Sequence, residues 1–296
     1  MKRKLLLLSM IILTTIGYTQ PPTIEWEKSF GGSLLDVGLA IDNTTDGYIV
    51  AGYSLSSDGN LTLNHGNADV LIIKTDQAGT VQWHKTYGGS LGEIARGIEQ
   101  TSDGGYIVCG YTSSSDGDIE QNHGSSDGWV IKLDAAGVIE WQKTYGGSGF
   151  DGVTEIHQTS DGGYIFSGFC GAADGDVTFS YGNQDIRVIK TDASGTIEWQ
   201  KNIGGSGSDS ASTIRFTNDG GYIVAGFTNS TDYDAIGNNG STDSMFVKMT
   251  ATGSVEWSTM SGGLYSDTAF QCSQTSDGGY IATGESEVVG GDLMNA

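Results

Sequence analysis

Short apolar runs alternate with polar turns along nearly the whole chain. The runs are rich in Val, Ile, Tyr and Phe and are bounded by Gly, Asp, Asn or Ser, as in segments 47–52, 69–74 and 106–110. Runs of about four to eight residues with this composition are typical of β-strands rather than helices. No segment after residue 20 has the apolar period of an amphipathic helix. The sequence therefore predicts an all-β protein.

This strand pattern repeats at a fixed interval, and tryptophan marks the repeat most clearly. Five tryptophans follow one another at 57 or 58 residues: Trp26, Trp83, Trp141, Trp199 and Trp257. Such a period indicates stacked structural units, because one unit alone cannot bury its apolar face. We predict a single repeat domain over residues 20–296, with units at about 33–89, 90–147, 148–205, 206–263 and 264–296.

Each unit has room for four antiparallel strands. An Asp-Gly-Gly turn, such as 103–105, joins the first two strands, since glycine tolerates the positive φ of a tight hairpin. A polar loop leads to the third strand, and an Asp-x-x-Gly turn such as 134–137 leads to the fourth. Units of this length and strand number predict the blades of a β-propeller. A stacked β-solenoid is the alternative, although its coils are usually much shorter.

The number of blades is open in the sequence. A lone strand is expected at Thr23 to Phe30, and only two strands follow the last tryptophan, at Thr268 to Thr275 and Tyr280 to Gly284. In a closed ring the lone strand would complete the last sheet and give five blades. We favour the other interpretation, a truncated larger propeller, because proteins usually cover an unpaired sheet edge.

At the Asp-x-x-Gly turn the chain resembles a known family. The segment 132–141, which ends in Trp141, resembles the tryptophan-docking motif of quinoprotein-like (PQQ-like) β-propellers. The whole repeat, including 101–106 and 122–124, resembles repeats of large secreted Bacteroidetes proteins, some of which are labelled endoglucanase-like. The resemblance implies a propeller in which each tryptophan packs between neighbouring blades. It implies no catalytic residue, because those repeats carry no catalytic motif.

Residues 1–19 have the pattern of a cleavable secretory signal. Lys2, Arg3 and Lys4 precede a short apolar region, and Gly17 and Thr19 place small residues before Gln20. The apolar region is too short to span a bilayer, so no membrane insertion is expected. We predict export from the cytoplasm, with the protein secreted, periplasmic or on the cell surface.

The charge of the chain restricts its partners. Its formal net charge is −22, and cleavage of the three basic leader residues would change it to −25. Nucleic-acid binding depends on Lys and Arg that neutralise phosphates, so nucleic acids and anionic membranes are disfavoured. We expect a monomer whose partner is an extracellular glycan or protein.

One register of the predicted first strand differs between units and carries polar or charged residues. It lies one residue beyond a recurrent apolar position and holds Asp42, Glu99, His157 and Arg215. Because the first strand of a propeller blade lines the central channel, these four are candidate ligand-binding residues. A solvated channel lining is the simpler alternative. Acids that recur in every unit are assigned to the scaffold, since one active site does not need five copies, and no catalytic residue is assigned.

The polar loop of the second unit is a candidate calcium site. Its oxygen ligands Asp116, Asp118 and Asn122 are followed by Asp127, and Ca²⁺ prefers such oxygens. The spacing is not that of an EF-hand, and Asx-turn capping is the simpler explanation. No other cofactor is expected, because the chain lacks zinc, phosphate-loop and nucleophile-elbow motifs.

The sequence thus predicts an exported, non-catalytic β-propeller that binds glycans or proteins. The first alternative is a carbohydrate-active hydrolase, which would need two unit-specific carboxylates in one pocket. The second is a quinoprotein-like oxidoreductase, which would need a cofactor pocket with a carboxylate-held metal.

Overall fold

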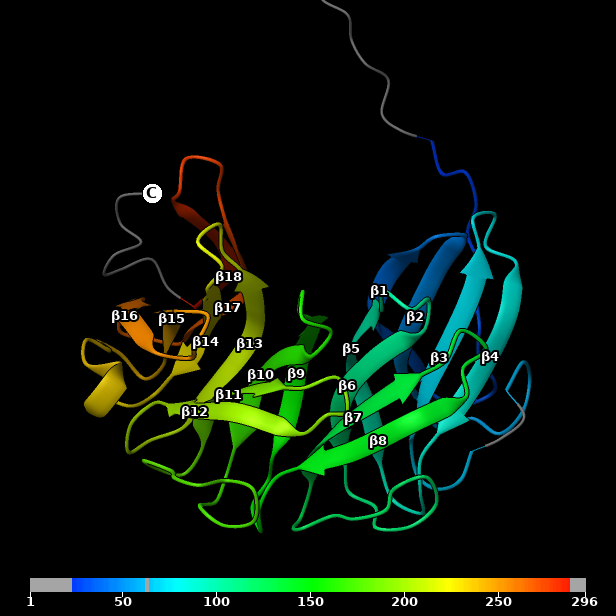
Figure 1. The fold of residues 1–296 in the computed structure, drawn as a ribbon, viewed down its shortest axis with the longest axis horizontal. Coiled ribbons are helices and arrows are strands. Elements are labelled where there is room, and N and C mark those ends of the chain that lie inside the picture. The colour runs from blue at the N-terminus through cyan, green and yellow to red at the C-terminus, as the bar shows by residue number, and fades with distance from the viewer. Residues whose placement is uncertain (1–22, 62–63, 288–296) are drawn as a thin grey trace, which may run out of the picture.

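A computed structural model describes residues 23–61 and 64–287 as five antiparallel sheets (Figure 1). The first four sheets have four strands each, hydrogen-bonded in chain order, and the fifth has two. The strands are β1 (Asp36–Thr44), β2 (Gly47–Ser54), β3 (Asp69–Asp76), β4 (Val81–Tyr87), β5 (Glu93–Gln100), β6 (Tyr106–Thr112), β7 (Asp127–Leu133), β8 (Ile139–Tyr145), β9 (Gly152–Gln158), β10 (Tyr164–Cys170), β11 (Asp185–Thr191), β12 (Ile197–Ile203), β13 (Asp209–Phe216), β14 (Tyr222–Thr228), β15 (Asp243–Met249), β16 (Val255–Ser261), β17 (Asp267–Gln274) and β18 (Tyr280–Ser286), with one short helix, η1 (Tyr233–Ala235).

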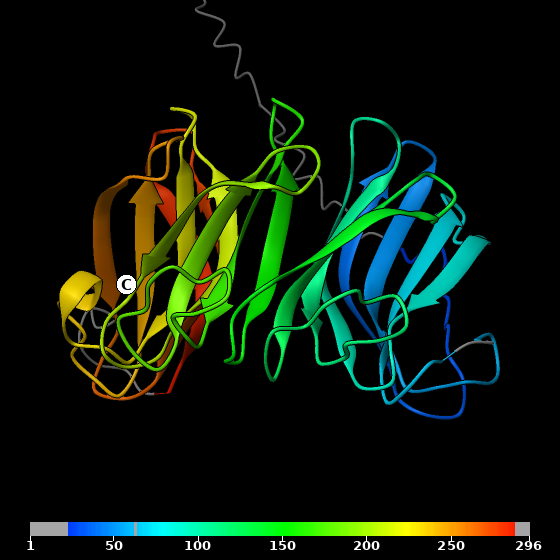
Figure 2. The same ribbon diagram turned by 60° about the horizontal axis from the view of Figure 1, so that its bottom comes forward.

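The five sheets are blades of a β-propeller, which confirms the predicted all-β fold class. They stand around a common axis as an open arc, with the first and fifth sheets at its ends (Figures 1 and 2). The first strand of each blade faces the concave side: β1, β5, β9, β13 and β17. None of the described residues forms a helix long and apolar enough to cross a bilayer.

The strands predicted at the two ends of the repeat domain can be compared with those at the two ends of the arc. The last two are confirmed as β17 and β18, whereas the strand expected at Thr23 to Phe30 is wrong, because that segment pairs with no sheet. It is held to the first blade by Trp26, whose Nε1 donates to the Gln77 carbonyl at 2.9 Å. The predicted signal peptide lies outside the described residues.

The middle strands of the blades are buried on both faces. Every residue of β7 and β11 is buried, while the fourth strands β8 and β12 are largely half-exposed. A strand covered by the neighbouring blade on each face needs apolar side chains in both directions, so its sequence is a continuous apolar run. This explains why the third strand of each unit, such as β3, shows no alternation.

The tryptophans of the fourth strands lie between successive blades, with Trp257 of β16 against Tyr280 of β18, and Trp26 lies against the first blade. Trp83 on β4 packs edge-on against Tyr106 of the next blade, with ring centroids 5.8 Å apart. It also lies against Gly137 of that blade, where an added Cβ would stand 3.0 Å from the indole. The φ of Gly137 is +71°, a backbone conformation that favours glycine. The turn therefore requires glycine both for this conformation and because a side chain would meet the indole. The same contacts join Trp26 to Tyr48 and Gly79, Trp141 to Tyr164 and Gly195, and Trp199 to Tyr222 and Gly253.

Each inner strand has a β-bulge at the same register. In β5 the pairing shifts between Ala95 and Gly97, so that Arg96 is the extra residue. The bulge brings the two backbones so close that a Cβ at Gly110 would lie 1.8 Å from the Ile94 carbonyl oxygen. Bulges re-aim a side chain, and here the extra residues all line the concave face. We call them the bulge ring: Leu39, Arg96, Thr154, Ser212 and Phe270.

The acids that recur in every unit bind backbone amides. Glu93 Oε2 accepts from the Gly89 amide at 2.8 Å, and Asp151, Asp209 and Asp267 hold the equivalent glycines of the later units. A carboxylate that accepts backbone N–H bonds fixes a turn where the sheet ladder offers no partner. These acids therefore belong to the scaffold.

A buried lysine supports the turn between the first two strands in each of the first four blades. Lys190 Nζ lies 3.0 Å from Asp161 Oδ2 and 2.9 Å from Glu198 Oε2, and Lys74, Lys132 and Lys248 stand at the same register. Hydrogen bonds from the Thr159 hydroxyl, the Gly163 amide and Lys190 lower the pKa of Asp161 to about 2. The turn is thus stabilised by an ionised aspartate.

This ionisation predicts a pH-dependent difference between the wild type and Asp161→Asn. The pKa of Asp161 in the folded protein lies below the usual aspartate value of 3.8, so its stabilisation is present above about pH 4 and is lost as the pH falls toward 2. Urea denaturation should show the variant less stable at pH 6, with a gap that narrows at acid pH. A gap independent of pH would show that the charge of Asp161 has no role.

The tryptophan contact predicts unequal effects for two glycine substitutions. Gly195 and Gly220 both have positive φ, +77° and +82°, so alanine at either costs about 1–2 kcal/mol of backbone strain. Only at Gly195 would the new Cβ meet a ring, 3.0 Å from Trp141, whereas nothing lies within 4 Å at Gly220. Gly195→Ala should therefore lose about 1–3 kcal/mol more in urea denaturation. Equal losses would contradict a tight contact between the blades.

Candidate functional site

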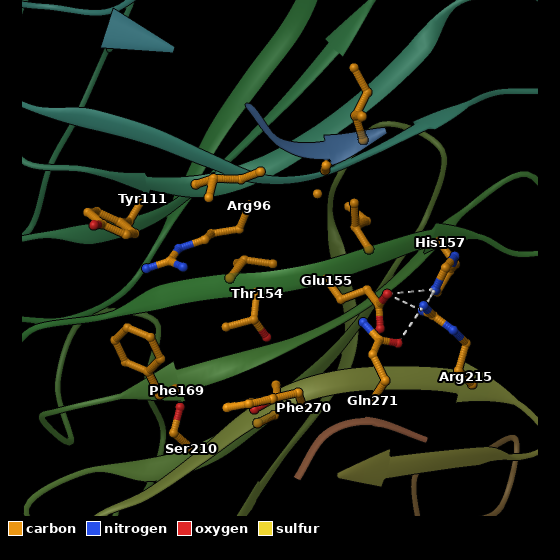
Figure 3. A pocket seen from close by; sticks show the side chains of 18 of the residues that line it. Arg96, Tyr111, Thr154, Glu155, His157, Phe169, Ser210, Arg215, Phe270 and Gln271 are labelled. Atoms are coloured by element: carbon orange, nitrogen blue, oxygen red, sulfur yellow. Dashed lines mark hydrogen bonds and ion pairs between the residues drawn. The ribbon is translucent and has the colours of Figure 1, made fainter. Parts of the chain in front are cut away.

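The concave face holds a cavity of about 870 Å³ that is lined by the inner strands of all five blades. The four residues predicted as ligand-binding all stand in its wall: Asp42, Glu99, His157 and Arg215. Figure 3 shows His157 and Arg215 at one side of this cavity and Arg96 at the other. The predicted register therefore does face a shared space, as an inner strand requires.

Three of the four predicted residues form one hydrogen-bonded chain. The His157 ring lies between Glu99 Oε2, 2.5 Å from Nδ1, and Arg215 Nη1, 2.7 Å from Nε2. A guanidinium only donates, so Nε2 must accept and the imidazole proton belongs on Nδ1, where it is donated to Glu99. The chain thus fixes the tautomer of His157 and links the second, third and fourth blades.

Glu155 completes this chain, and the sequence analysis missed it. Its carboxylate forms an ion pair with Arg215 and accepts from the Thr213 hydroxyl at 2.6 Å and the Ile214 amide at 2.7 Å. Arg215 Nη2 also donates to Gln271 Oε1 at 3.0 Å. Glu155 directly precedes the recurrent apolar position, where the other units have Ala40, Gly97, Thr213 and Gln271. That variation was a signal that could have identified it.

Asp42 stands apart from the chain and has a structural contact. Its Oδ2 accepts from the Gln100 amide of the next blade at 2.9 Å, just as Glu99 Oε1 accepts from the Gln158 amide at 2.9 Å. The predicted register therefore ties the first three blades together. Within the described residues, His157 and Arg215 accept no hydrogen bond from a backbone amide of the next blade. At the later junctions this register therefore does not tie two blades together.

A second hydrogen bond recurs between neighbouring blades, but it is missing at the junction of the third and fourth blades. At three other positions a glutamine carboxamide accepts from a backbone amide of the preceding blade: Gln100 from Thr45, Gln158 from Ser102 and Gln274 from Asn218. Phe216 occupies this register in the fourth blade, is 46% exposed, and packs against His157 with centroids 5.9 Å apart. It lines a groove of about 930 Å³ beside Ser160 and Tyr222. The repeat pattern is thus broken twice at this junction.

Glu99 and Glu155 are two unit-specific carboxylates in one pocket, as a hydrolase would need. Their side chains are only 27% and 15% exposed, and Glu155 Oε1 lies 3.8 Å from His157 Nε2. All four oxygens face donors: an imidazole, a guanidinium, a hydroxyl or backbone amides. Both carboxylates are therefore engaged by protein donors, whereas glycoside hydrolysis needs two carboxyl groups that face the scissile bond.

The predicted calcium ligands have separate partners. Asp116 Oδ1 accepts from the Ser90 amide at 2.8 Å, Asp118 Oδ2 from Gly88 at 3.0 Å, Asn122 Oδ1 from Gly124 at 3.0 Å, and Asp127 Oδ2 from His123 at 2.8 Å. Within residues 23–61 and 64–287, no three His, Cys, Asp or Glu side chains form a metal-binding group. Calcium binding stays a prediction; only the Asn122 bond has the spacing of an Asx-turn, while Asp116 and Asp118 accept from amides of a distant segment.

Comparisons with known proteins add no family. No protein-family model matches the chain, and no curated protein sequence matches it. Among solved structures, it is similar to a protein of unknown function from Bacteroides caccae, with TM-score 0.41 and 14% identity over 76% of this chain and 81% of that one. A protein of unknown function from Dyadobacter fermentans gives 0.42 and 13%, over 83% and 74%. BamB from Moraxella catarrhalis gives 0.25 and 12%, over 82% and 94%.

The missing glutamine predicts a stability difference between two substitutions. Phe216→Gln should restore the bond to the preceding blade, here to the Ser160 amide, while Phe216→Ala removes the same ring contacts and offers no carboxamide. The glutamine variant should therefore be more stable than the alanine variant by about 0.5–1.5 kcal/mol, the net value of one hydrogen bond. Thermal and urea unfolding measure this difference. If the two variants are equally stable, the recurrent glutamine has no capping role.

Proposed function

We propose that the protein is an exported, non-catalytic binding scaffold whose concave cavity holds an extracellular glycan or protein. This proposal rests on one observation: the residues that depart from the repeat pattern lie close together. Glu155, His157 and Arg215 differ from their counterparts in other blades, and all three line the same cavity. Phe216 breaks the pattern next to them.

The scaffold does not require these side chains. Sibling blades fold with Ala40 or Gly97 at the register of Glu155, and with Ser273 at the register of Arg215. A partly buried network of charged groups contributes little net stability, because desolvation offsets the attraction between the charges. Side chains that the fold does not need, gathered in a concave space, are the expected property of a binding site.

The hydrogen bonds that Glu99 and Glu155 already accept from protein groups favour a binding function over hydrolysis. Glu99 and Glu155 are each held by donors, and Arg215 lies against Glu155. A general acid must lie within hydrogen-bond reach of the substrate atom that it protonates, and both carboxylates already bond to protein groups. The same groups suit recognition, because their remaining donor and acceptor positions are fixed in direction before a ligand arrives.

The charge of the chain favours a glycan or protein over a nucleic acid. With a formal net charge of −22, the protein repels extended polyanions. The cavity wall combines polar groups with aromatic rings such as Tyr111 and Phe270. Amphipathic walls of this kind suit ligands that present hydroxyl or amide groups together with apolar faces.

Binding of purified protein to a glycan array, with reducing-sugar release measured in parallel, tests this proposal. We expect binding without sugar release. Arg215→Ala should weaken binding about tenfold, since it removes charged hydrogen bonds in the cavity wall. Lys143→Ala is the control, because Lys143 lies on the outer strand β8, away from the cavity.

Three results would contradict the proposal. Release of sugar from a bound glycan would show a hydrolase. Equal binding by Arg215→Ala and the wild type, with both folded by circular dichroism, would place the site outside the His157 side of the cavity. Failure to bind either an array of glycans or a panel of extracellular proteins would exclude the scaffold function.

A further inference from the structure

Arg96 differs from the other arginines of the described chain in its surroundings. Arg187 donates to the Gln200 side chain and the Asp176 carbonyl, and Arg215 pairs with Glu155. Arg96 has no oxygen partner within residues 23–61 and 64–287, although the chain holds 36 acids. It is the only cation of the bulge ring, and its side chain is exposed in the cavity.

This guanidinium lies beside a cluster of three aromatic rings. Arg96 Cζ lies 6.0 Å from the centre of the Tyr111 ring, at a cation–π distance. The Tyr111 ring meets Phe150 edge-on at 5.8 Å, and Phe150 stacks on Phe169 at 5.3 Å with an interplanar angle of 25°. Phe150 remains 49% exposed. Figure 3 shows the Arg96 side chain extending into the space between Tyr111 and Phe169.

Hydroxyl groups from the neighbouring blades line the same cavity, and Figure 3 shows Thr154 and Ser210 on the side of Arg96 and Phe169. Thr154 is the bulge residue of the third blade and Ser212 that of the fourth, and Ser210 also lies in the wall. Thr154 Oγ1 donates to the Ser167 carbonyl at 3.0 Å, which leaves its lone pairs to accept. An unpaired cation, an exposed aromatic ring and hydroxyls therefore occur together. We call this part of the cavity the Arg96 pocket: Arg96, Tyr111, Phe150, Thr154, Phe169 and Ser210.

We propose that the Arg96 pocket binds a sugar unit that carries one carboxylate, a hexuronate at the end of a glycan. This inference rests on the proposed binding function and names the ligand class for one side of the cavity. The carboxylate would take the guanidinium fork, which matches its two oxygens. The apolar C–H face of the pyranose ring would lie on Phe150, and the sugar hydroxyls would bond to the hydroxyls of the wall.

The acidity of the whole protein restricts this ligand to few charges. Interactions between exposed charges are largely screened beyond about 8 Å at physiological salt. A single carboxylate in contact with Arg96 is therefore governed by that contact, while a long polyanion would also approach acidic surface elsewhere. This favours a terminal uronate over a densely charged chain such as a nucleic acid.

Calorimetric titration with a disaccharide that ends in glucuronate, and with its methyl ester, tests the assignment. The ester keeps the shape of the sugar and removes its charge, so the wild type should bind the acid about tenfold more tightly than the ester, the value of one charged hydrogen bond. Arg96→Ser should bind both equally weakly. Serine stands at this register in the fourth blade as Ser212, so the substitution suits the scaffold.

A second variant tests the aromatic surface separately. Phe150→Ser uses the residue that sibling units carry as Ser208 and Ser266. It should weaken binding of acid and ester alike, because it removes the stacking face and leaves Arg96 in place. Lys143→Ser serves as the control for loss of one positive charge outside the cavity, and circular dichroism melting verifies that each variant is folded.

Each outcome distinguishes this inference from the broader function. Equal affinity of the wild type for acid and ester, or an Arg96→Ser variant that still discriminates between them, would overturn it. Binding only to neutral glycans would overturn it and leave the binding scaffold intact. Arg96-dependent capture of a peptide through its C-terminal carboxylate, without uronate binding, would show that the pocket serves a protein ligand.

Discussion

The contact between a recurrent tryptophan and a glycine turn, made by Trp26, Trp83, Trp141 and Trp199, is the interaction on which this structure depends. A four-stranded sheet buries neither face by itself, so a blade depends on a neighbouring blade to cover its apolar side chains. The indole fills the space that only a glycine with positive φ leaves open, as at Trp83 and Gly137. Trp26 makes the same contact from a segment that belongs to no sheet, so the contact acts without strand pairing.

This dependence divides the residues into two groups. Recurrent acids, lysines and glycines hold turns and blade junctions in every unit, and their hydrogen bonds go to backbone or to one another. The remaining polar groups, Glu155, His157, Arg215 and Arg96, differ from unit to unit and share one cavity. Because the recurrent groups hold the turns and blade junctions, the unit-specific groups can vary without loss of the fold.

The cavity itself has two chemically different sides. Around His157 each charge is matched by an opposite charge or a hydrogen-bond donor, which gives a rigid polar wall. On the other side, Arg96 faces the Tyr111 ring and has no oxygen partner within the described residues. A matched network orients a ligand, whereas an unmatched cation gains most from binding one, because its charged hydrogen bonds are still to be made.

The sequence by itself determined the all-β class, the repeat length, the turns and the register that faces the cavity, because strand patterning and turn chemistry are local and five copies repeat them. It wrongly predicted a strand at Thr23 to Phe30, since strand composition does not specify a pairing partner. It also missed Glu155, the bulge at Arg96 and the exposure of Phe216. Those depend on cross-strand register and on which blades become neighbours, and only the tertiary structure decides them.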